Sequence, residues 1–270
     1  MSSAPRRRAA EHRPPVPPDL LLRQLQNLGI GIGDLLVVHS AFSRTGPVEG
    51  GPEGLIDALR RAIGPRGTLM MPSMSSEDDR PFDPATTPCP DMGIVADTFR
   101  RLPGVLRSDS PHAFAAMGPL VEHLLRPHPV DPPHGPDSPP GRAHQLGGRV
   151  LLLGIGHEAN TTVHLAEWLA GVRYRVPAYA TVFDKGRPRR IDYLEIDHCC
   201  ERFAQVDDWL DSENLQLRGR VGYGEARLAN SADIVRSVVR HLRDDDTTFL
   251  HPPGACDACD AAWRSFPAHD

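Results

Sequence analysis

Short hydrophobic runs alternate with segments of helical spacing in the first part of the chain. Four leucines after Asp19, an acceptable N-cap, recur at helical spacing and predict a helix over 19–28. The apolar run 35–39 predicts a buried strand, and it is followed by a predicted helix over 52–63 and a second buried strand over 68–72. A strand, a helix and a strand in this order predict a parallel βαβ unit.

The second half of the chain shows the same kinds of segment. An apolar strand is predicted over 149–153, and the chain turns helical from His157. The segments 73–92 and 126–143 are rich in proline and polar residues, and loops of this length are usually functional or disordered. Their position between well-patterned segments favours a functional role. Further short strands are expected at 180–183 and 190–194, and further helices at 93–101, 200–210 and 231–242.

Composition narrows the class of protein. The 24 glycines and 28 prolines among 270 residues exclude a plain helical bundle and favour an α/β domain with long loops. No apolar run approaches the roughly 18 residues of a membrane-spanning helix, so we expect no membrane partner. Five cysteines, without an apolar N-terminal region, favour the cytoplasm over a secreted disulfide scaffold. We expect residues 1–18 to form a disordered tail and 19–270 one domain.

The distribution of charge argues against a nucleic-acid-binding protein. The net charge is -5, but residues 1–18 hold four arginines against one glutamate, so the rest of the chain carries -8. An acidic domain repels phosphate backbones, which argues against nucleic-acid binding and suits a cationic small molecule. Solubility alone also explains net acidity. The sequence leaves open whether the chain is a monomer or a homodimer.

His157 follows a predicted strand and two glycines, where an α/β fold places its sites. If a helix begins there, Asn160, Thr161 and His164 share one polar arc with it, since they lie within about 60° of it around the helix axis. His157 then suits a general base. A zinc protease is excluded, because Thr161 stands where the second histidine ligand is required.

Several co-linear strings resemble the aminoglycoside 3-N-acetyltransferases, from about residue 19 to the C-terminus. Residues 197–203 and 251–259 resemble one branch of that family, the branch that includes apramycin-modifying enzymes. The strings that carry the likeness are Leu36-Val-Val-His39-Ser40-Ala-Phe42, Gly67-Thr-Leu-Met-Met-Pro72, Arg107-Ser108 leading to Phe114-Ala-Ala-Met-Gly118-Pro119, and Leu151-Leu-Leu-Gly-Ile-Gly-His157-Glu-Ala-Asn160-Thr161-Thr-Val-His164-Leu-Ala-Glu167.

The resemblance implies a single α/β acyltransferase domain of the antibiotic N-acetyltransferase type, unlike the GNAT fold. It implies transfer of acetyl from acetyl-CoA to the 3-amino group of a 2-deoxystreptamine ring. His157 would be the base, with Glu167, Asn160 and Thr161 around it. Ser110-Pro111-His112 departs from the usual order and leaves the role of His112 open. The implied coenzyme contacts are His39, Ser40, Ala41, Phe42, Ser43, Gly46, Arg107 and Ser108.

Aminoglycosides are polycations, so carboxylates are expected around them. Asp78 and Asp79 lie in an acidic loop, and Glu195 and Asp197 lie at a predicted strand end. Their position favours substrate binding, although a solvated acidic surface explains any one of them equally well.

The cysteines near the C-terminus form a second pattern. Cys199, Cys200, Cys256 and Cys259, with nearby histidines, suit a four-coordinate structural zinc that ties the C-terminal segment to the domain. Buried free thiols and a redox pair are the competing interpretations.

Two other functions remain open at this point. The nearer is an acetyltransferase of the same fold that acts on a different amine. The other is a metal-dependent hydrolase with His134, His157, His164 and Asp197 as ligands.

Overall fold

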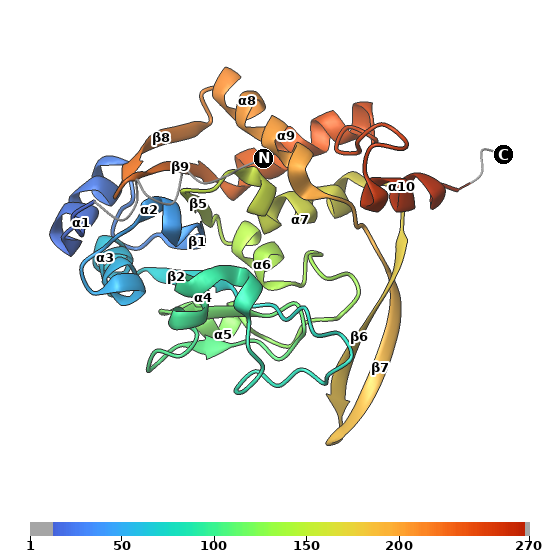
Figure 1. Ribbon diagram of the computed structural model, residues 1–270, viewed down its shortest axis with the longest axis horizontal. Helices are drawn as coiled ribbons and strands as arrows, with labels where there is room; N and C mark the ends of the chain where they lie inside the picture. Colours follow the sequence, from blue (N-terminus) through green and yellow to red (C-terminus); the bar gives the residue numbers. More distant parts are fainter. Residues whose placement is uncertain (1–12, 268–270) are drawn as a thin grey trace, which may run out of the picture.

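A seven-stranded mixed sheet runs through the centre of the molecule in the order β3-β4-β2-β1-β5-β9-β8 (Figure 1). The computed structural model describes residues 13–267. The strands of the sheet are β1 (Leu35–Ser40), β2 (Thr68–Pro72), β3 (Leu106–Arg107), β4 (Phe114–Met117), β5 (Arg149–Leu153), β8 (Gln216–Val221) and β9 (Gly224–Asn230).

Three parallel strands form the middle of the sheet. β1 pairs with β2 on one side and with β5 on the other, and both pairings are parallel. The predicted βαβ unit is therefore confirmed. Antiparallel strands extend the sheet at both edges, since β4 pairs with β2 and β9 pairs with β5. The carboxyl ends of the three parallel strands consequently meet at one edge of the sheet.

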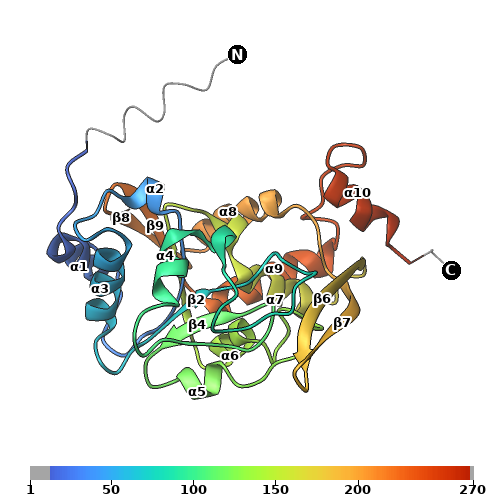
Figure 2. The same cartoon turned by 60° about the horizontal axis from the view of Figure 1, so that its bottom comes forward.

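Helices cover both faces of the sheet (Figure 2). On one face lie α1, α3 and α4, with α1 packed beside α3. On the other lie α5 to α9, with α7 packed on α9. The helices are α1 (Pro18–Asn27), α2 (Phe42–Thr45), α3 (Gly51–Ile63), α4 (Gly93–Phe99), α5 (Val121–Leu124), α6 (Pro139–Gln145), α7 (Thr161–Ala170), α8 (Gln205–Ser212), α9 (Ser231–Asp244) and α10 (Asp257–Arg264), with 3-10 turns η1 (Pro90–Met92), η2 (His157–Ala159) and η3 (Cys200–Ala204).

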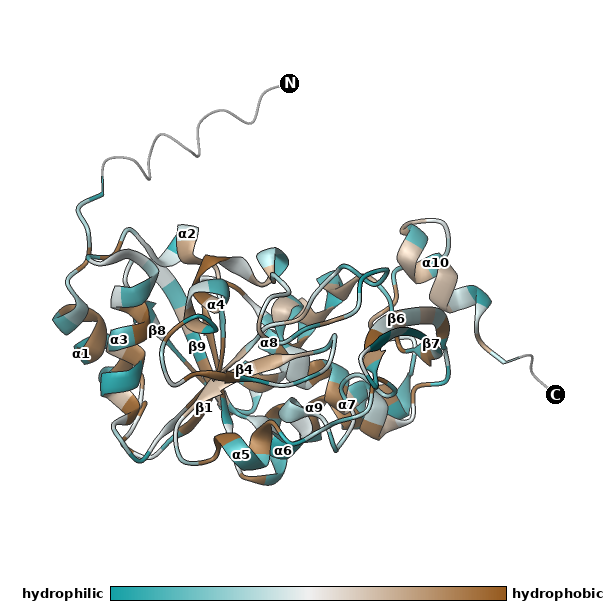
Figure 3. Cartoon of the chain, turned by 90° about the horizontal axis from the view of Figure 1, so that it is seen from below, coloured by the Kyte–Doolittle hydropathy of each residue, from teal (hydrophilic) through white to brown (hydrophobic). Residues whose placement is uncertain are grey.

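Successive side chains of the central strands point alternately into the hydrophobic cores on the two faces of the sheet. Leu36 and Val38 of β1 enter the core under α1 and α3, whereas Leu35 and Val37 enter the core under α7 and α9. A strand buried on both faces reads as a continuous hydrophobic run. The central strands are accordingly brown in the hydropathy view of Figure 3. This double burial is why 35–39, 68–72 and 149–153 were recognisable from the sequence.

A separate two-stranded hairpin stands beside the sheet. It consists of β6 (Val176–Asp184) and β7 (Arg187–Glu195), paired antiparallel over their full length. The hairpin holds the acidic loop of 73–92, because the Thr181 hydroxyl donates to the Asp78 carbonyl at 2.6 Å and the Tyr179 hydroxyl donates to the Asp79 carboxylate at 2.9 Å. Glu195, at its end, lies near the mouth of the site described below.

The structure corrects several predicted boundaries. The helix expected from His157 is a 3-10 turn followed by α7, because Asn160 is extended (ψ 103°) and its side chain caps α7. Val16 is buried and pairs with Val48, so the packed part of the chain begins before residue 19. The remainder of the predicted tail, 1–12, lies outside the described residues. The edge strands β3, β4, β8 and β9 and the helix α10 were not predicted.

None of the helices within residues 13–267 is long and apolar enough to cross a membrane.

Candidate active site

A cavity of about 270 Å³ opens where the parallel strands end. Ser40 ends β1, Pro72 ends β2, and Ile155 follows β5, and all three line it. Ligands of α/β folds bind at this edge of the sheet. We call it the strand-end cavity. Its walls are Val38, His39, Ser40, Pro72, Met74, Asp91, Met92, Gly93, Ala96, His134, Ile155, Ala159, Thr161 and His164.

A second, narrower cavity of about 50 Å³ lies between α7 and the end of the β6–β7 hairpin. We call it the hairpin cavity. His134 and His164 line both cavities, so the two histidines stand between them. The walls of the hairpin cavity are Asp131, Pro132, Pro133, His134, His164, Trp168, Arg175, Leu194, Glu195 and Ile196.

His164 is held by a buried carboxylate one turn further along α7. Its Nδ1 lies 2.9 Å from Oε2 of Glu167, which has no exposed surface. A carboxylate only accepts, so in the neutral form of the ring Nδ1 carries the proton and Nε2 has the lone pair. A carboxylate that fixes the tautomer of an imidazole is the arrangement that prepares a histidine to act as a general base.

Glu167 is ionised despite its burial. Burial alone would raise the pKa of Glu167, but His198 and His164 outweigh this effect and lower the pKa to about 2. The His198 Nε2 lies 2.7 Å from its Oε1, and the Tyr174 hydroxyl donates to the same oxygen at 3.1 Å. Hydrogen bonds to both oxygens offset the cost of burying this charge. The carboxylate is therefore fixed against His164.

The surroundings of His164 make it a stronger base than free histidine. Burial lowers its pKa, but Cys200 and Glu167 outweigh burial and raise the pKa well above 6.5. The Cys200 sulfur lies 3.5 Å from Nε2, and the ring of Phe203 packs edge-on against the imidazole at 5.0 Å. The side chain of His164 is nevertheless 23% exposed. It can thus meet a substrate proton from the cavities.

His157 occupies a different environment. It has no exposed surface, and both of its ring nitrogens are already hydrogen-bonded to protein. The Asn160 carbonyl oxygen accepts from the Thr162 amide, so its amino group faces Nδ1 of His157 at 3.0 Å. Nε2 then donates to Oε1 of Gln216 at 2.8 Å. Burial, partly offset by Gln216, lowers the pKa of His157.

This arrangement leaves His157 neutral and without a free lone pair for a substrate proton. Gln216 is oriented in turn by the Asp207 carboxylate, which accepts from its amide at 2.9 Å and from Arg227 at 2.7 Å. The network joins η2 to β8 and α8, so His157 connects elements under the site. The two expected orienting residues have different partners: Asn160 orients His157, and Glu167 orients His164.

The residues expected at the coenzyme fall into two groups. His39 and Ser40 line the strand-end cavity, and the Thr161 hydroxyl lies 3.4 Å from Nε2 of His39. Ala41 donates its amide to Leu153, and Phe42, Ser43 and Gly46 follow in and after α2, where the Phe42 ring packs against the core.

Arg107 and Ser108 hold loops. The Arg107 guanidinium donates to the backbone carbonyls of Ser73 and Thr87, and its pKa is lowered to about 10 by burial. The Ser108 hydroxyl accepts from the Phe114 amide and meets His128 at 3.1 Å. Arg107 therefore shapes the acidic loop that borders the site.

Of the four carboxylates expected at the substrate, Glu195 lines the hairpin cavity. Burial, and then Asp197 beside it, raises the pKa of Glu195 to about 7. Asp78 adds to the same effect from the acidic loop, where its carbonyl and the Asp79 carboxylate accept from the hairpin. Asp131, which lines the cavity, was not predicted. The hairpin cavity is consequently lined by two carboxylates, together with Arg175.

Sequence reasoning did not place Trp168 or His198 at the site, and it considered His134 only as a ligand of the hydrolase alternative. His134 lies in a Pro-rich loop, and its ring centroid is 5.3 Å from that of His164. Trp168 follows Glu167 on α7 and is 39% exposed at the hairpin cavity. His198 adjoins a cysteine pair that drew attention to metal binding instead. His112, whose role was open, meets the Tyr193 hydroxyl at 3.1 Å.

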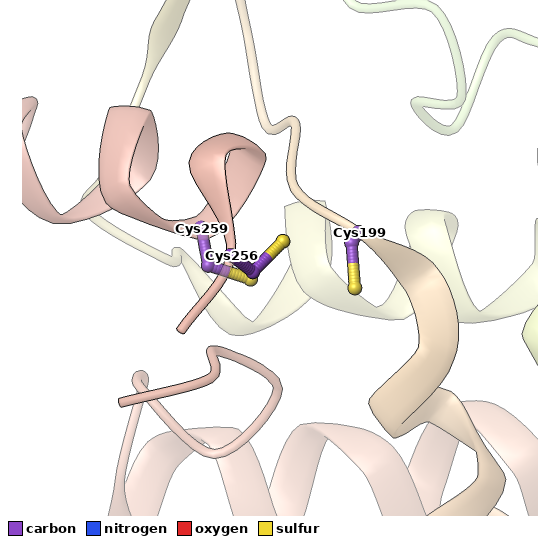
Figure 4. A group of neighbouring side chains, drawn as sticks. All are labelled: Cys199, Cys256 and Cys259. Carbon is purple, nitrogen blue, oxygen red and sulfur yellow. The ribbon is translucent and has the colours of Figure 1, made fainter. Parts of the chain in front are cut away.

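Only three of the four cysteines that were predicted to bind zinc lie together. The sulfurs of Cys199, Cys256 and Cys259 lie within 4.8 Å of one another (Figure 4). Cys200 instead faces His164. The hydrolase alternative requires a metal held by His134, His157, His164 and Asp197. Within residues 13–267, no three of these residues bring their ligand atoms within 4.8 Å of one another. The geometry therefore gives no support to the hydrolase alternative.

Comparisons with known proteins agree with this architecture. A family model described as aminoglycoside 3-N-acetyltransferase matches residues 37–243. The chain is 56% identical over 235 residues to aminoglycoside N(3)-acetyltransferase IV from Salmonella sp, which covers 86% of this chain and 90% of the relative. It is 35% identical over 258 residues to aminoglycoside N(3)-acetyltransferase VII from Streptomyces paromomycinus, covering 82% and 89%.

Solved structures are similar over almost the whole chain. The apoenzyme of aminoglycoside acetyltransferase AAC(3)-IVa matches with a TM-score of 0.92 and 52% identity, covering 94% of this chain and 99% of that one. A histidine-to-alanine variant of that enzyme is known in complex with gentamicin and with apramycin. AAC-IIIb with CoASH matches with a TM-score of 0.78 and 27% identity, covering 85% and 97%.

Proposed function

The chain belongs to the aminoglycoside 3-N-acetyltransferase family, and from this premise we propose that it transfers acetyl from acetyl-CoA to the 3-amino group of an aminoglycoside's 2-deoxystreptamine ring. Membership makes the protein an acyltransferase. One observation carries the finer proposal: His164, oriented by Glu167, stands between two cavities of different character. A transferase needs a base at the point where its two substrates meet.

We assign the base to His164 and no longer to His157. Nε2 of His164 takes a proton from the amine while the amine nitrogen attacks the thioester carbonyl. The C–N bond forms, the C–S bond breaks, and the coenzyme A thiolate takes up the proton that His164 has collected. Glu167 stabilises the imidazolium that exists between these steps. A histidine-to-alanine change in the antibiotic complexes of the relative is in keeping with a histidine base.

The strand-end cavity is the proposed site of the acetylated end of coenzyme A. It is the larger of the two cavities, and Met74, Met92 and Ala96 give it an apolar wall that suits the pantetheine arm. Ser40 and His39 are the polar groups on the strand side. Binding of CoASH by AAC-IIIb supports this choice of acyl donor.

The hairpin cavity is the proposed site of the amine. Glu195 and Asp131 supply carboxylates, which a polycation requires, and Trp168 offers an apolar face to a sugar ring. The cavity admits only part of a multi-ring antibiotic, so we expect the other rings to extend along the β6–β7 hairpin. Gentamicin and apramycin, bound by the relative, are the first substrates to test.

Five free thiols suit a reducing compartment, and we propose that the reaction takes place in the cytoplasm.

A panel of aminoglycosides with acetyl-CoA tests the proposal. Coenzyme A release is followed with a thiol reagent, and the position of the acetyl group in each product is determined by NMR. We expect release with at least gentamicin or apramycin and acetylation at N3. Release with another amine and with no aminoglycoside would establish the alternative acetyltransferase. Acetylation at a different nitrogen would overturn the regiochemistry.

A further inference from the structure

Three thiols converge where the C-terminal segment meets the start of η3, and the imidazole of His251 lies beside one of them, Cys199. Cys256 directly precedes α10, Cys259 lies in its first turn, and Cys199 directly precedes η3 (Figure 4). Their three sulfurs lie within 4.8 Å of one another. We propose that Cys199, Cys256, Cys259 and His251 bind one structural Zn²⁺.

The distances suit tetrahedral zinc. Zn–S bonds of about 2.3 Å in a tetrahedron place the sulfurs about 3.8 Å apart. The sulfurs here therefore need to approach one another by roughly 1 Å or less. Cys256 and Cys259 are separated by two residues at the start of a helix, which is the common zinc-ribbon and zinc-finger half-site, and Cys199 adds the third thiolate from a distant segment.

His251 supplies the fourth ligand. A ring nitrogen of His251, the sulfur of Cys199 and a carboxylate oxygen of Glu201 lie within 4.8 Å of one another, so His251 and the thiol cluster share Cys199. Its Nε2 is buried and makes no hydrogen bond within residues 13–267, and the Glu201 carboxylate lies 3.4 Å from it. Coordination to zinc would give this nitrogen the bond that it lacks. Trp263 of α10 donates to the His251 carbonyl at 2.8 Å and fixes its backbone.

The segment that would be tied down has few other anchors before α10. Residues 252–255 are exposed, and the chain regains the core only at Cys259 and Ala262. A metal would order this loop by joining both its ends to Cys199. Because Cys259 and Ala262 are packed in any case, we expect loss of the metal to loosen α10 and leave the central sheet folded.

The metal would also position the catalytic histidine indirectly. His198 and Cys200 flank Cys199 in the chain, and they contact Glu167 and His164 respectively. Fixing Cys199 thus fixes both neighbours against the pair that we propose for catalysis. This consequence rests on the proposed function, whereas metal binding itself does not. The four ligands are positioning residues in this sense.

Metal analysis of the full chain, purified with added zinc and without chelator, tests the site. We expect about one Zn²⁺ per chain, and a chromogenic chelator should detect its release when a mercurial modifies the thiols. Replacement by Co²⁺ should give the intense visible bands and sulfur charge-transfer absorption of a tetrahedral thiolate site. Protein that binds less than about 0.1 equivalent would overturn the proposal.

Matched cysteine variants locate the metal. Cys256→Ser with Cys259→Ser should lose the zinc and the cobalt spectrum, and His251→Ala should weaken zinc binding by tenfold or more. Cys200→Ala, the adjacent thiol, and Cys89→Ser, a distant buried thiol, should keep one equivalent. Retention by the double variant, or loss in the Cys200 variant, would refute the assignment. Should the double variant not fold, mercurial release from the unmodified protein still decides the question.

If metal is found, removal of zinc by a chelator separates its role from the function. We expect a lower Tm in every case, with recovery on adding zinc back. Where aminoglycoside acetylation is established, we also expect kcat to fall while the substrate KM stays within about threefold. A protein with zinc and no aminoglycoside activity would refute the proposed function and leave the metal site standing.

Discussion

At the scale of single residues, the site depends on which of two histidines reaches the cavities, and this is His164. His157 and His164 lie seven positions apart, and both follow the same strand in the sequence. Both ring nitrogens of His157 are hydrogen-bonded, to Asn160 on one side and to Gln216 on the other. Gln216 comes from β8, 59 positions further along the chain. A local pattern cannot show such a contact, and this is why the sequence and the geometry favour different members of the pair.

The pH dependence of catalysis follows from the partners of His164. The reaction needs its neutral form, and its pKa lies above 6.5, so kcat/KM should rise with pH along a limb above that of free histidine. Glu167→Gln removes a charge that raises this pKa, and the limb should move to lower pH while the rate falls. Glu158→Gln, an exposed carboxylate changed in the same way, should leave the profile in place. An unmoved limb in the Glu167 variant would contradict the pairing.

Glu195 gives the antibiotic site its own pH dependence. Its pKa is raised to about 7 by burial and by Asp197, so its carboxylate becomes fully charged only above that pH. Binding of a cationic aminoglycoside, measured by calorimetry without acetyl-CoA, should therefore strengthen as pH rises from 5 to 7, where most of the antibiotic amines are protonated. Glu195→Gln should weaken binding and flatten this dependence. Equal affinity at both pH values in the unmodified protein would oppose the assignment.

At the scale of elements, burial decided which strands were recognisable. β1, β2 and β5 are buried on both faces and read as apolar runs. β8 lies at the sheet edge, four of its six residues are exposed, and its sequence Gln-Leu-Arg-Gly-Arg-Val shows no apolar stripe. The start of α7 was misplaced for a related reason. Asn160 reads as one more polar residue of a helix, whereas in the fold it ends η2 and caps α7.

The cap of α7 is testable against a matched asparagine. The Asn160 side chain accepts from the Thr162 amide and donates to His157. Asn160→Ala should lower the free energy of unfolding by about 1–2 kcal/mol, measured in urea, because a cap bond is lost and a buried ring nitrogen loses its partner. Asn230 precedes α9 without a side-chain cap bond, so Asn230→Ala should cost clearly less. Similar losses in the two variants would contradict the role of the cap.

At the scale of the whole molecule, the fold brings distant segments to one edge of the sheet. The ends of β1, β2 and β5, the loops after β2 and before α6, and the end of the β6–β7 hairpin all contribute walls to the two cavities. The sequence indicated the parallel centre and the functional loops, because both leave local patterns. It did not indicate how the hairpin meets α7, since that contact joins segments without any shared pattern. The hairpin cavity thereby receives two carboxylates, Glu195 and Asp131.

The most direct test of the account compares two matched substitutions. Glutamine keeps hydrogen-bonding capacity but cannot take up a proton, so His164→Gln and His157→Gln separate a catalytic histidine from a structural one. Turnover of gentamicin and acetyl-CoA, with antibiotic affinity measured alongside, is the readout. We predict that His164→Gln lowers kcat by about 10²–10⁴-fold with little change in affinity, and that His157→Gln retains kcat within about tenfold. The reverse order of losses would contradict the account.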